Sequence, residues 1–128
     1  MIDHLTLMVR DMGRSVDFYT RALAPLGYVA KAHHEPTIGF GVADDGLHSD
    51  FYLTPAGSDA CSPLTHIAFR ASDASVVDAF YREAIAAGGR GNGVPGPRDY
   101  HPGYYSAFVL DPDGINVEAV VDWSGLRA

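Results

Sequence analysis

The sequence Thr65-His-Ile-Ala-Phe-Arg70 restates Asp3-His-Leu-Thr-Leu-Met8 near the start of the chain. When His66 is aligned on His4, the match continues without a gap through the residues that follow each stretch. The matching pairs are Asp11 and Asp73, Phe18 and Phe80, Tyr19 and Tyr81, Ala22 and Ala84, and Gly27 and Gly89. A repeat of half the chain length predicts two modules related by a pseudo-two-fold axis rather than a solenoid.

The second half of each copy matches as well. The segment Phe40 to Asp50 (F-G-V-A-D-D-G-L-H-S-D) aligns with Phe108 to Glu118 (F-V-L-D-P-D-G-I-N-V-E), which places Asp50 on Glu118. The second copy is longer ahead of this match, and its extra length falls in the glycine- and proline-rich run from Gly88 to Gly103. So many breakers predict a long irregular loop there, of the kind that often carries function.

Composition favours one globular domain with a small-molecule partner. The chain has 128 residues, of which 47% are hydrophobic and 20% charged, enough apolar content for a single core. Its formal net charge of −7 disfavours nucleic acid or an anionic membrane as partner, because either would need a basic patch. A small neutral, cationic or metal-chelating ligand fits this charge better.

The sequence also predicts a cytoplasmic location. The start of the chain leads directly into a strand pattern without a signal-peptide pattern, and no apolar run reaches the roughly 18 to 20 residues of a membrane span. The single cysteine, Cys61, has no second cysteine with which to form a disulfide within the chain. A reducing compartment is therefore expected.

Hydrophobic periodicity predicts the elements of an α+β fold. Alternation of apolar and polar residues indicates strands over residues 2–9, 28–33, 37–42, 48–54, 64–71, 104–110 and 115–121. Apolar residues at helical spacing indicate helices from Asp11 to Leu26 and from Asp73 to the Gly88-Gly89 pair. We therefore expect a single domain, residues 1–128, with a first module at 1–56, a linker at 57–63, a second module at 64–121 and a tail at 122–128.

Four residues with metal-ligand chemistry occupy equivalent positions in the two copies. His4 and His66 alternate with apolar residues in the first strand of each copy, and Asp50 and Glu118 do so in the last strand. If the helices cover the apolar faces, all four side chains point to the opposite, open face. Two imidazoles and two carboxylates suit a divalent metal ion such as Zn, Ni, Mn, Co or Fe, with positions left open for substrate oxygens.

The alternative is that these histidines are ordinary packed or surface groups, as a lone strand histidine usually is. The equivalence of His4 and His66 through the repeat, with acids at the partner positions, favours the metal site. Converging histidine and acid groups cost desolvation unless a cation is present. Asp50 is one methylene shorter than a glutamate, so its alternative role is to hold a water molecule or the substrate.

Further candidates come from the glycine-rich run and from the open face. His101 could act as a proton donor, and the phenols of Tyr104 and Tyr105 could form hydrogen bonds to a substrate. Because these tyrosines are adjacent in a strand, at most one of them faces the pocket, and a histidine in a turn can equally be solvated. Tyr52 and Arg70 share the parity of the open face and are expected to line the substrate pocket.

These motifs resemble the vicinal oxygen chelate superfamily, which includes glyoxalase I, fosfomycin resistance proteins, bleomycin-binding proteins and extradiol dioxygenases. The resemblance rests on His4 and His66 opening their strands, on S-V-D-F-Y at Ser15 to Tyr19, and on D-P-D-G-I-N-V-E at Asp111 to Glu118. It covers nearly the whole chain. It implies two tandem βαβββ modules that form an eight-stranded cup, usually in a homodimer whose modules pair within or between chains.

The resemblance also implies the roles of site residues. The family's metal positions fall on His4, His66 and Glu118, with Asp50 where glyoxalase I has a glutamate that shuttles protons. His101 lies roughly where extradiol dioxygenases have an active-site histidine, whereas their tyrosine ahead of the last turn is matched by Phe108. The segment His101-Pro-Gly-Tyr-Tyr-Ser-Ala-Phe-Val resembles small bacterial glyoxalase-like proteins.

The function expected from these observations is that of a glyoxalase-like, metal-dependent lyase or isomerase that chelates vicinal oxygens of a small substrate. Glu118 and His101 are the expected catalytic residues, as ligand or base and as acid or base. The first alternative is a metal-free protein of the bleomycin-resistance type that sequesters a small ligand between Tyr52, Tyr104 and Trp123. The second alternative is a dioxygenase, which would need redox-active iron.

Overall fold

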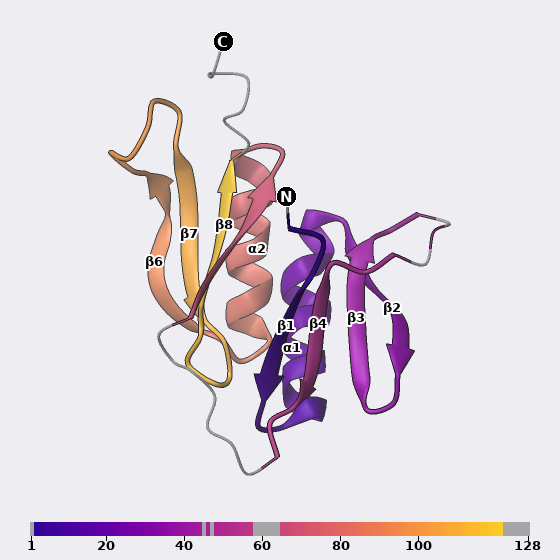
Figure 1. The fold of residues 1–128 in the computed structure, drawn as a ribbon. Coiled ribbons are helices and arrows are strands. Elements are labelled where there is room, and N and C mark those ends of the chain that lie inside the picture. Colours follow the sequence, from indigo (N-terminus) through magenta and orange to yellow (C-terminus); the bar gives the residue numbers. More distant parts are fainter. Residues whose placement is uncertain (1, 45, 47, 58–64, 122–128) are drawn as a thin grey trace.

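The computed structural model describes residues 2–44, 46, 48–57 and 65–121 and contains the predicted repeat (Figure 1). In the first module the elements are β1 Leu5–Val9, α1 Met12–Leu23, the 3-10 turn η1 Ala24–Leu26, β2 Tyr28–His34, β3 Thr37–Val42 and β4 Phe51–Pro55. In the second they are β5 His66–Ala71, α2 Ala74–Ala86, β6 Arg90–Pro97, β7 Tyr105–Leu110 and β8 Asn116–Val121. Most of the expected linker, the expected tail, Cys61 and Trp123 lie outside the described residues.

The eight strands form two separate four-stranded sheets with the same internal order. The first sheet runs β1-β4-β3-β2 and the second β5-β8-β7-β6, so each module has its first strand at one edge. The pairs β1–β4 and β5–β8 are parallel and the other pairs are antiparallel. The predicted α+β fold with a βαβββ pattern written twice is therefore confirmed.

Each helix covers one face of its sheet and leaves the other face open (Figure 1). In β1 the side chains of Leu7 and Val9 are buried, whereas the alternating Thr6 and Met8 are exposed. Both helices begin where the sequence predicted, because an aspartate N-cap accepts a hydrogen bond from the third residue beyond it: Asp11 from the Arg14 N–H at 3.0 Å and Asp73 from the Val76 N–H at 3.1 Å. Neither described helix has the length and apolar character needed to cross a membrane.

The two modules share one hydrophobic core. The ring of Phe51, from β4, lies 5.4 Å from that of Phe69, from β5, and 5.0 Å from that of Tyr19, from α1. Tyr28, from β2, also touches Phe69 edge-on at 5.8 Å. Aromatic contacts of this kind stabilise the fold beyond the effect of the apolar area that they bury. The seam between the modules is therefore held by large buried side chains and does not act as a flexible joint.

A polar contact closes one end of this seam. The turn from Asp111 to Gly114, which we call the bridging turn, joins β7 to β8 in the second module but bonds to the first. Asp111 accepts a hydrogen bond from the Tyr19 hydroxyl at 2.6 Å, and Asp113 accepts from the Arg10 backbone N–H at 3.4 Å. Both carboxylates are almost fully buried. The bridging turn thus belongs to the packing between modules as much as to its own hairpin.

The glycine-rich run was predicted to be an irregular loop, and this expectation is wrong for half of it. Residues Arg90–Pro97 form β6, with register shifts between Gly91 and Gly93 and between Gly93 and Gly96. Because β6 is an edge strand, its prolines do not have to donate to a neighbour on the outer side. Bulges at the glycines absorb the irregular spacing, so a composition typical of loops is compatible with a strand here.

Gly89 sits where the end of α2 comes closest to the core. A Cβ atom at this position would lie 2.5 Å from Val109 Cγ1 and 2.7 Å from Phe18 Cε1. We expect Gly89→Ala to lower the free energy of unfolding by about 1–3 kcal/mol, because both neighbours are fully buried and must shift. Urea unfolding measures the change.

Gly13→Ala is the matched control for this substitution. Gly13 is an exposed position in α1, and a Cβ there meets only the Asp11 carboxylate at 3.6 Å. This variant should gain about 0.4–1 kcal/mol of stability, because alanine restricts the unfolded chain. Equal effects of the two substitutions would contradict the close approach at Gly89.

Candidate metal site

His66 and Glu118 meet on the open face of the second sheet. They lie on the neighbouring parallel strands β5 and β8, where the register pairs Ala68 with Glu118 and His66 with Asn116. His66 Nε2 is 3.0 Å from Glu118 Oε1. The Glu118 side chain is 4% exposed and that of His66 is 45% exposed, so the carboxylate forms the floor of the site and the imidazole its rim.

The second nitrogen of His66 decides what this contact can be. Nδ1 lies 3.0 Å from the backbone carbonyl oxygen of Asn116, which only accepts, so Nδ1 carries a hydrogen. In the neutral imidazole Nε2 then carries no hydrogen, and its lone pair faces an oxygen lone pair of Glu118. Two acceptors at this distance require a proton or a metal cation between them. A histidine ligand whose other nitrogen donates to a backbone carbonyl is the arrangement that metal sites use, so His66 and Glu118 fit a divalent ion.

Tyr104 completes this group. Its hydroxyl donates to Glu118 Oε2 at 2.6 Å, so each oxygen of the carboxylate has a partner. Among the described residues no arginine or lysine forms an ion pair with Glu118. His101 is exposed on the neighbouring loop, with its ring 6.0 Å from that of Tyr104. Tyr105 points the opposite way, as strand alternation requires, and its hydroxyl donates to Asp78 of α2 at 2.8 Å.

The Tyr104 phenol should stay protonated well into the alkaline range. Desolvation raises its pKa first, and the hydrogen bond to the Glu118 carboxylate raises it further. A folded pKa raised above the unfolded value of about 10 gives stability that is fully present below pH 10 and lost as pH rises through the folded pKa. We expect the phenolate absorbance of native protein to show no ionisation of Tyr104 at pH values where an ordinary tyrosine is half ionised.

The Tyr104→Phe variant isolates this phenol from the others. When its alkaline titration is subtracted from that of the wild-type protein, the difference in phenolate absorbance should rise only at a pH above the ordinary tyrosine pKa. A difference curve centred near the ordinary tyrosine pKa would show that Tyr104 is not held by Glu118.

Two residues beside the site were not predicted from sequence. Phe108 pairs in register with Glu118, and its ring lies 6.0 Å from that of His66. The guanidinium of Arg98 lies 5.5 Å from the centre of the Phe108 ring. Strand alternation ahead of the Asp-Pro-Asp-Gly turn places Phe108 on the face of Glu118, and this signal could have identified it. Arg98 follows the irregular strand β6, where alternation gives no guide.

The other predicted ligands lie on the first module. His4, with its side chain 55% exposed, has Nδ1 2.8 Å from Asp3 Oδ1 and its ring 5.5 Å from that of Tyr52. Asp50 lies directly before β4 and accepts a hydrogen bond from the Tyr28 hydroxyl at 2.7 Å. Burial and the Asp50 carboxylate raise the pKa of Tyr28, so this phenol also remains a donor.

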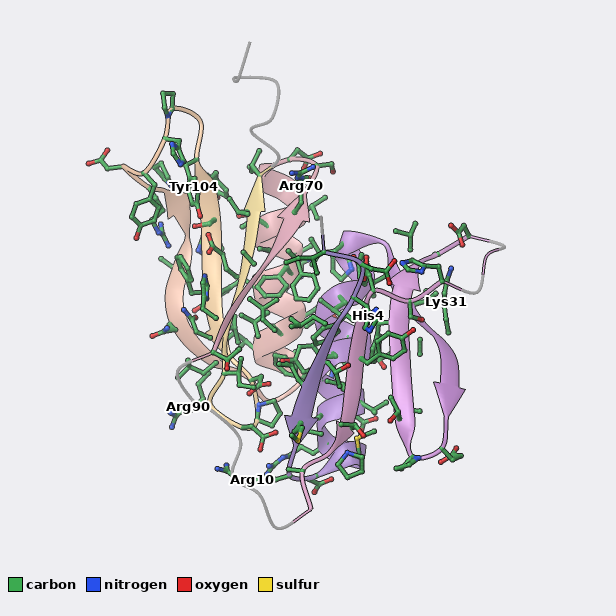
Figure 2. The ribbon with its side chains drawn as sticks, viewed as in Figure 1. His4, Arg10, Lys31, Arg70, Arg90 and Tyr104 are labelled. Carbon is green, nitrogen blue, oxygen red and sulfur yellow. The ribbon has the colours of Figure 1, made fainter. Side chains whose placement is uncertain are left out.

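The structure therefore divides the predicted site residues into two groups. His66, Glu118 and Tyr104 come together on the second sheet, whereas His4, Asp50 and Tyr52 belong to the first, and Figure 2 shows His4 and Tyr104 on different sheets. In the part of the chain that is described, no three His, Cys, Asp or Glu residues lie close enough to hold one ion. Arg70 belongs to neither group; it is exposed and lines a cavity of about 370 Å³ together with Tyr28, Phe69 and Val76.

Comparison with known proteins agrees with this fold. The family model for the Glyoxalase/Bleomycin resistance protein/Dioxygenase superfamily matches residues 1–119. The chain belongs to this superfamily. A comparison with the curated proteins finds no significant match.

Several solved structures share the fold. A glyoxalase/bleomycin resistance protein from Albidiferax ferrireducens is 26% identical with a TM-score of 0.78, and the match covers 93% of this chain and 96% of that one. A glyoxalase/bleomycin resistance protein/dioxygenase family enzyme from Burkholderia phytofirmans is 19% identical, with a TM-score of 0.71 and coverage of 94% and 97%. A glyoxalase I mutant from Zea mays is 22% identical, with a TM-score of 0.70 over 93% of this chain and 43% of that one.

Proposed function

We propose that this protein is a metal-dependent enzyme of the glyoxalase type, a lyase or isomerase acting on a small substrate with two adjacent oxygens. The observation that carries the proposal is the orientation of His66, whose Nδ1 is tied to a carbonyl while Nε2 faces Glu118 Oε1 at 3.0 Å. The buried carboxylate has no arginine or lysine beside it among the described residues, so a cation would satisfy both groups. Membership of the superfamily supports the same reading.

We further propose that the complete site forms between two copies of the chain. His66 and Glu118 would supply one half, and His4 and Asp50 of a second copy would supply the other. The exposed open face of the first sheet supports this proposal, because His4 is 55% exposed in its side chain and Met8 is 47% exposed in a single chain. In a two-fold dimer the first sheet of each copy would face the second sheet of the other, so the contact would be self-complementary.

The residues of this site would divide the chemistry among them. A bound divalent ion would polarise two substrate oxygens as a Lewis acid. Tyr104 holds Glu118 at Oε2 and leaves Oε1 for the ion or for a substrate proton. His101 lies on the exposed loop beside Tyr104 and would serve as the acid or base.

Metal content tests the proposal, and paired variants test the shared site. Wild-type protein reconstituted with Zn, Ni, Mn, Co or Fe should bind close to one ion per chain, and His4→Ala or His66→Ala should each bind none. Mixing the two variants should restore roughly one quarter of the wild-type content, because half of randomly paired dimers are mixed and each mixed dimer holds one intact site of two. No recovery would place all ligands within one chain or reject the site.

A metal-free binding protein is the second candidate, and one observation favours it. Asp50 and His4 already have partners within the chain, Tyr28 and Asp3. Wild-type protein that binds none of the five metals would support this candidate and contradict the enzyme. Zinc or nickel as the native ion would contradict dioxygenase chemistry, which needs a redox-active metal.

A further inference from the structure

Arg98 stands across the hairpin from Tyr104 and leans over the second sheet. Its backbone N–H donates to the Tyr104 carbonyl oxygen at 2.9 Å, so the two residues are neighbours at the top of the β6–β7 hairpin. Its guanidinium covers the Phe108 ring, whose strand position pairs with Glu118. The ring of Phe108 in turn lies against His66. Arg98 is thus the cation at the edge of the His66–Glu118 site.

The glycines of β6 make room for this position. A Cβ atom at Gly93 would lie 3.2 Å from Arg98 Nη2, and one at Gly96 would lie 3.2 Å from Nη1. A Cβ atom at either position would crowd the guanidinium and require it to shift slightly. The unusual composition of the strand therefore has a local consequence, which is an arginine lying flat against the face that carries the site.

Among the residues that the structure describes, the charge of Arg98 has no acidic partner. Nη2 donates to the Val94 carbonyl at 2.8 Å and Nη1 to the Pro97 carbonyl at 3.3 Å, and no carboxylate lies within ion-pair distance among the residues that the structure describes. A guanidinium has five N–H donors, so three remain available in the plane of the group. Both carbonyls orient the guanidinium, and the Phe108 ring shields one side of it.

We propose that Arg98 is the anion-binding residue of this site and that the substrate is a small organic carboxylate which also carries two adjacent oxygens. The inference rests on the proposed function for the adjacent oxygens, whereas the carboxylate contact rests on Arg98 alone. The carboxylate accepts hydrogen bonds from the free edge of the guanidinium, in the paired geometry that arginine offers to carboxylates. The rest of the substrate extends past Phe108 and Tyr104 toward His66 and Glu118.

Two matched pairs of probes test this assignment. On metal-free protein, benzoate should shift the backbone amide NMR signals of residues beside Arg98, such as Tyr104, and benzyl alcohol at the same concentration should not. On zinc-loaded protein, the catechol carboxylate protocatechuate should bind about tenfold more tightly than its methyl ester, because the ester keeps the catechol oxygens but lacks the negative charge. Calorimetry measures both affinities.

Variants separate charge from folding. Arg98→Gln should bind the catechol acid and its ester equally and should not respond to benzoate, with an unchanged urea midpoint. Arg90→Gln removes the same charge from the other end of β6 and should keep the wild-type preference. Arg98→Lys keeps the positive charge without the planar guanidinium and should recover part of the preference for the acid over the ester.

The outcomes distinguish this inference from the proposed function. Equal affinity of wild-type protein for acid and ester, or benzoate binding that survives in Arg98→Gln, overturns the role of Arg98 while leaving the metal site intact. Failure of both catechols to bind zinc-loaded protein contradicts the chelation of vicinal oxygens. The benzoate experiment still decides on Arg98 in that case, because it needs no metal.

Discussion

The Glu118→Gln variant is expected to lose at least about 100-fold in affinity for divalent metal while the chain stays folded. Glutamine has nearly the same shape as glutamate but no negative charge to offset that of the ion. Its amide can still accept a hydrogen bond from the Tyr104 hydroxyl. The loss should therefore appear in the metal content and leave the urea unfolding midpoint of the metal-free protein close to that of the wild type.

Glu83→Gln is the control for this substitution. Glu83 lies on α2, partly exposed, and is 3.6 Å from Arg21. Removal of its charge should leave metal content unchanged. Tyr104→Phe should give a smaller loss than Glu118→Gln, of about 10-fold, because it removes a group that orients the ligand and not the ligand itself. Metal bound equally by Glu118→Gln and wild type would place the ion elsewhere.

The second large effect is expected at the seam between the modules. Asp111→Ala should lower the free energy of unfolding by about 2–4 kcal/mol, because it leaves buried donors without an acceptor. The carboxylate accepts from the Tyr19 hydroxyl at 2.6 Å and from the backbone N–H groups of Asp113 at 2.8 Å and Ile115 at 2.9 Å. Asp111→Asn keeps an acceptor for both backbone groups and should cost far less. Equal losses in the two variants would contradict this explanation.

The pH dependence of Asp111 gives a separate check. Burial raises the pKa of Asp111, because it disfavours the charged carboxylate. This effect is larger than the opposite effect of the hydrogen bonds that Asp111 accepts, which lower the pKa. A folded pKa above the unfolded value of 3.8 means that the contribution of Asp111 to stability is greatest below pH 3.8 and is lost as pH rises through the folded pKa. The stability of wild type relative to Asp111→Asn should therefore increase as pH falls through this window. Urea unfolding at a series of pH values measures it.

The repeat is the reason why the fold could be predicted. Local patterns in each copy support the same elements, and the aspartate caps at Asp11 and Asp73 set the helix starts in both. Strand β6 escaped prediction because glycine and proline exclude most central strands, and only its place at the sheet edge makes them tolerable. β6 reaches the sheet edge only by pairing with β7, and the local sequence pattern does not show this pairing.

Strand alternation in the sequence predicted which site residues share a face within one module. It did not predict how the site residues of the two modules lie relative to each other. His66 and Glu118 face each other because β5 and β8 pair in parallel with the same alternation that the sequence shows. The separation of His4 from this pair depends on how the buried rings of the seam pack, and no periodic pattern encodes that packing. Arg98 could not be anticipated for a related reason, since the bulges of β6 break the alternation that would have placed it.

The candidate site lies partly on core strands and partly on an exposed hairpin, and this division has an evolutionary consequence. His66 and Glu118 stand on adjacent strands, and Glu118 lies between Val117 and Ala119, which are fully buried, so substitutions beside it disturb the core. Arg98, His101 and Tyr104 stand on an exposed hairpin that tolerates exchange of residues and length. A lineage can therefore change what the protein selects by substituting residues of this hairpin while the strands that carry the proposed metal ligands stay unchanged.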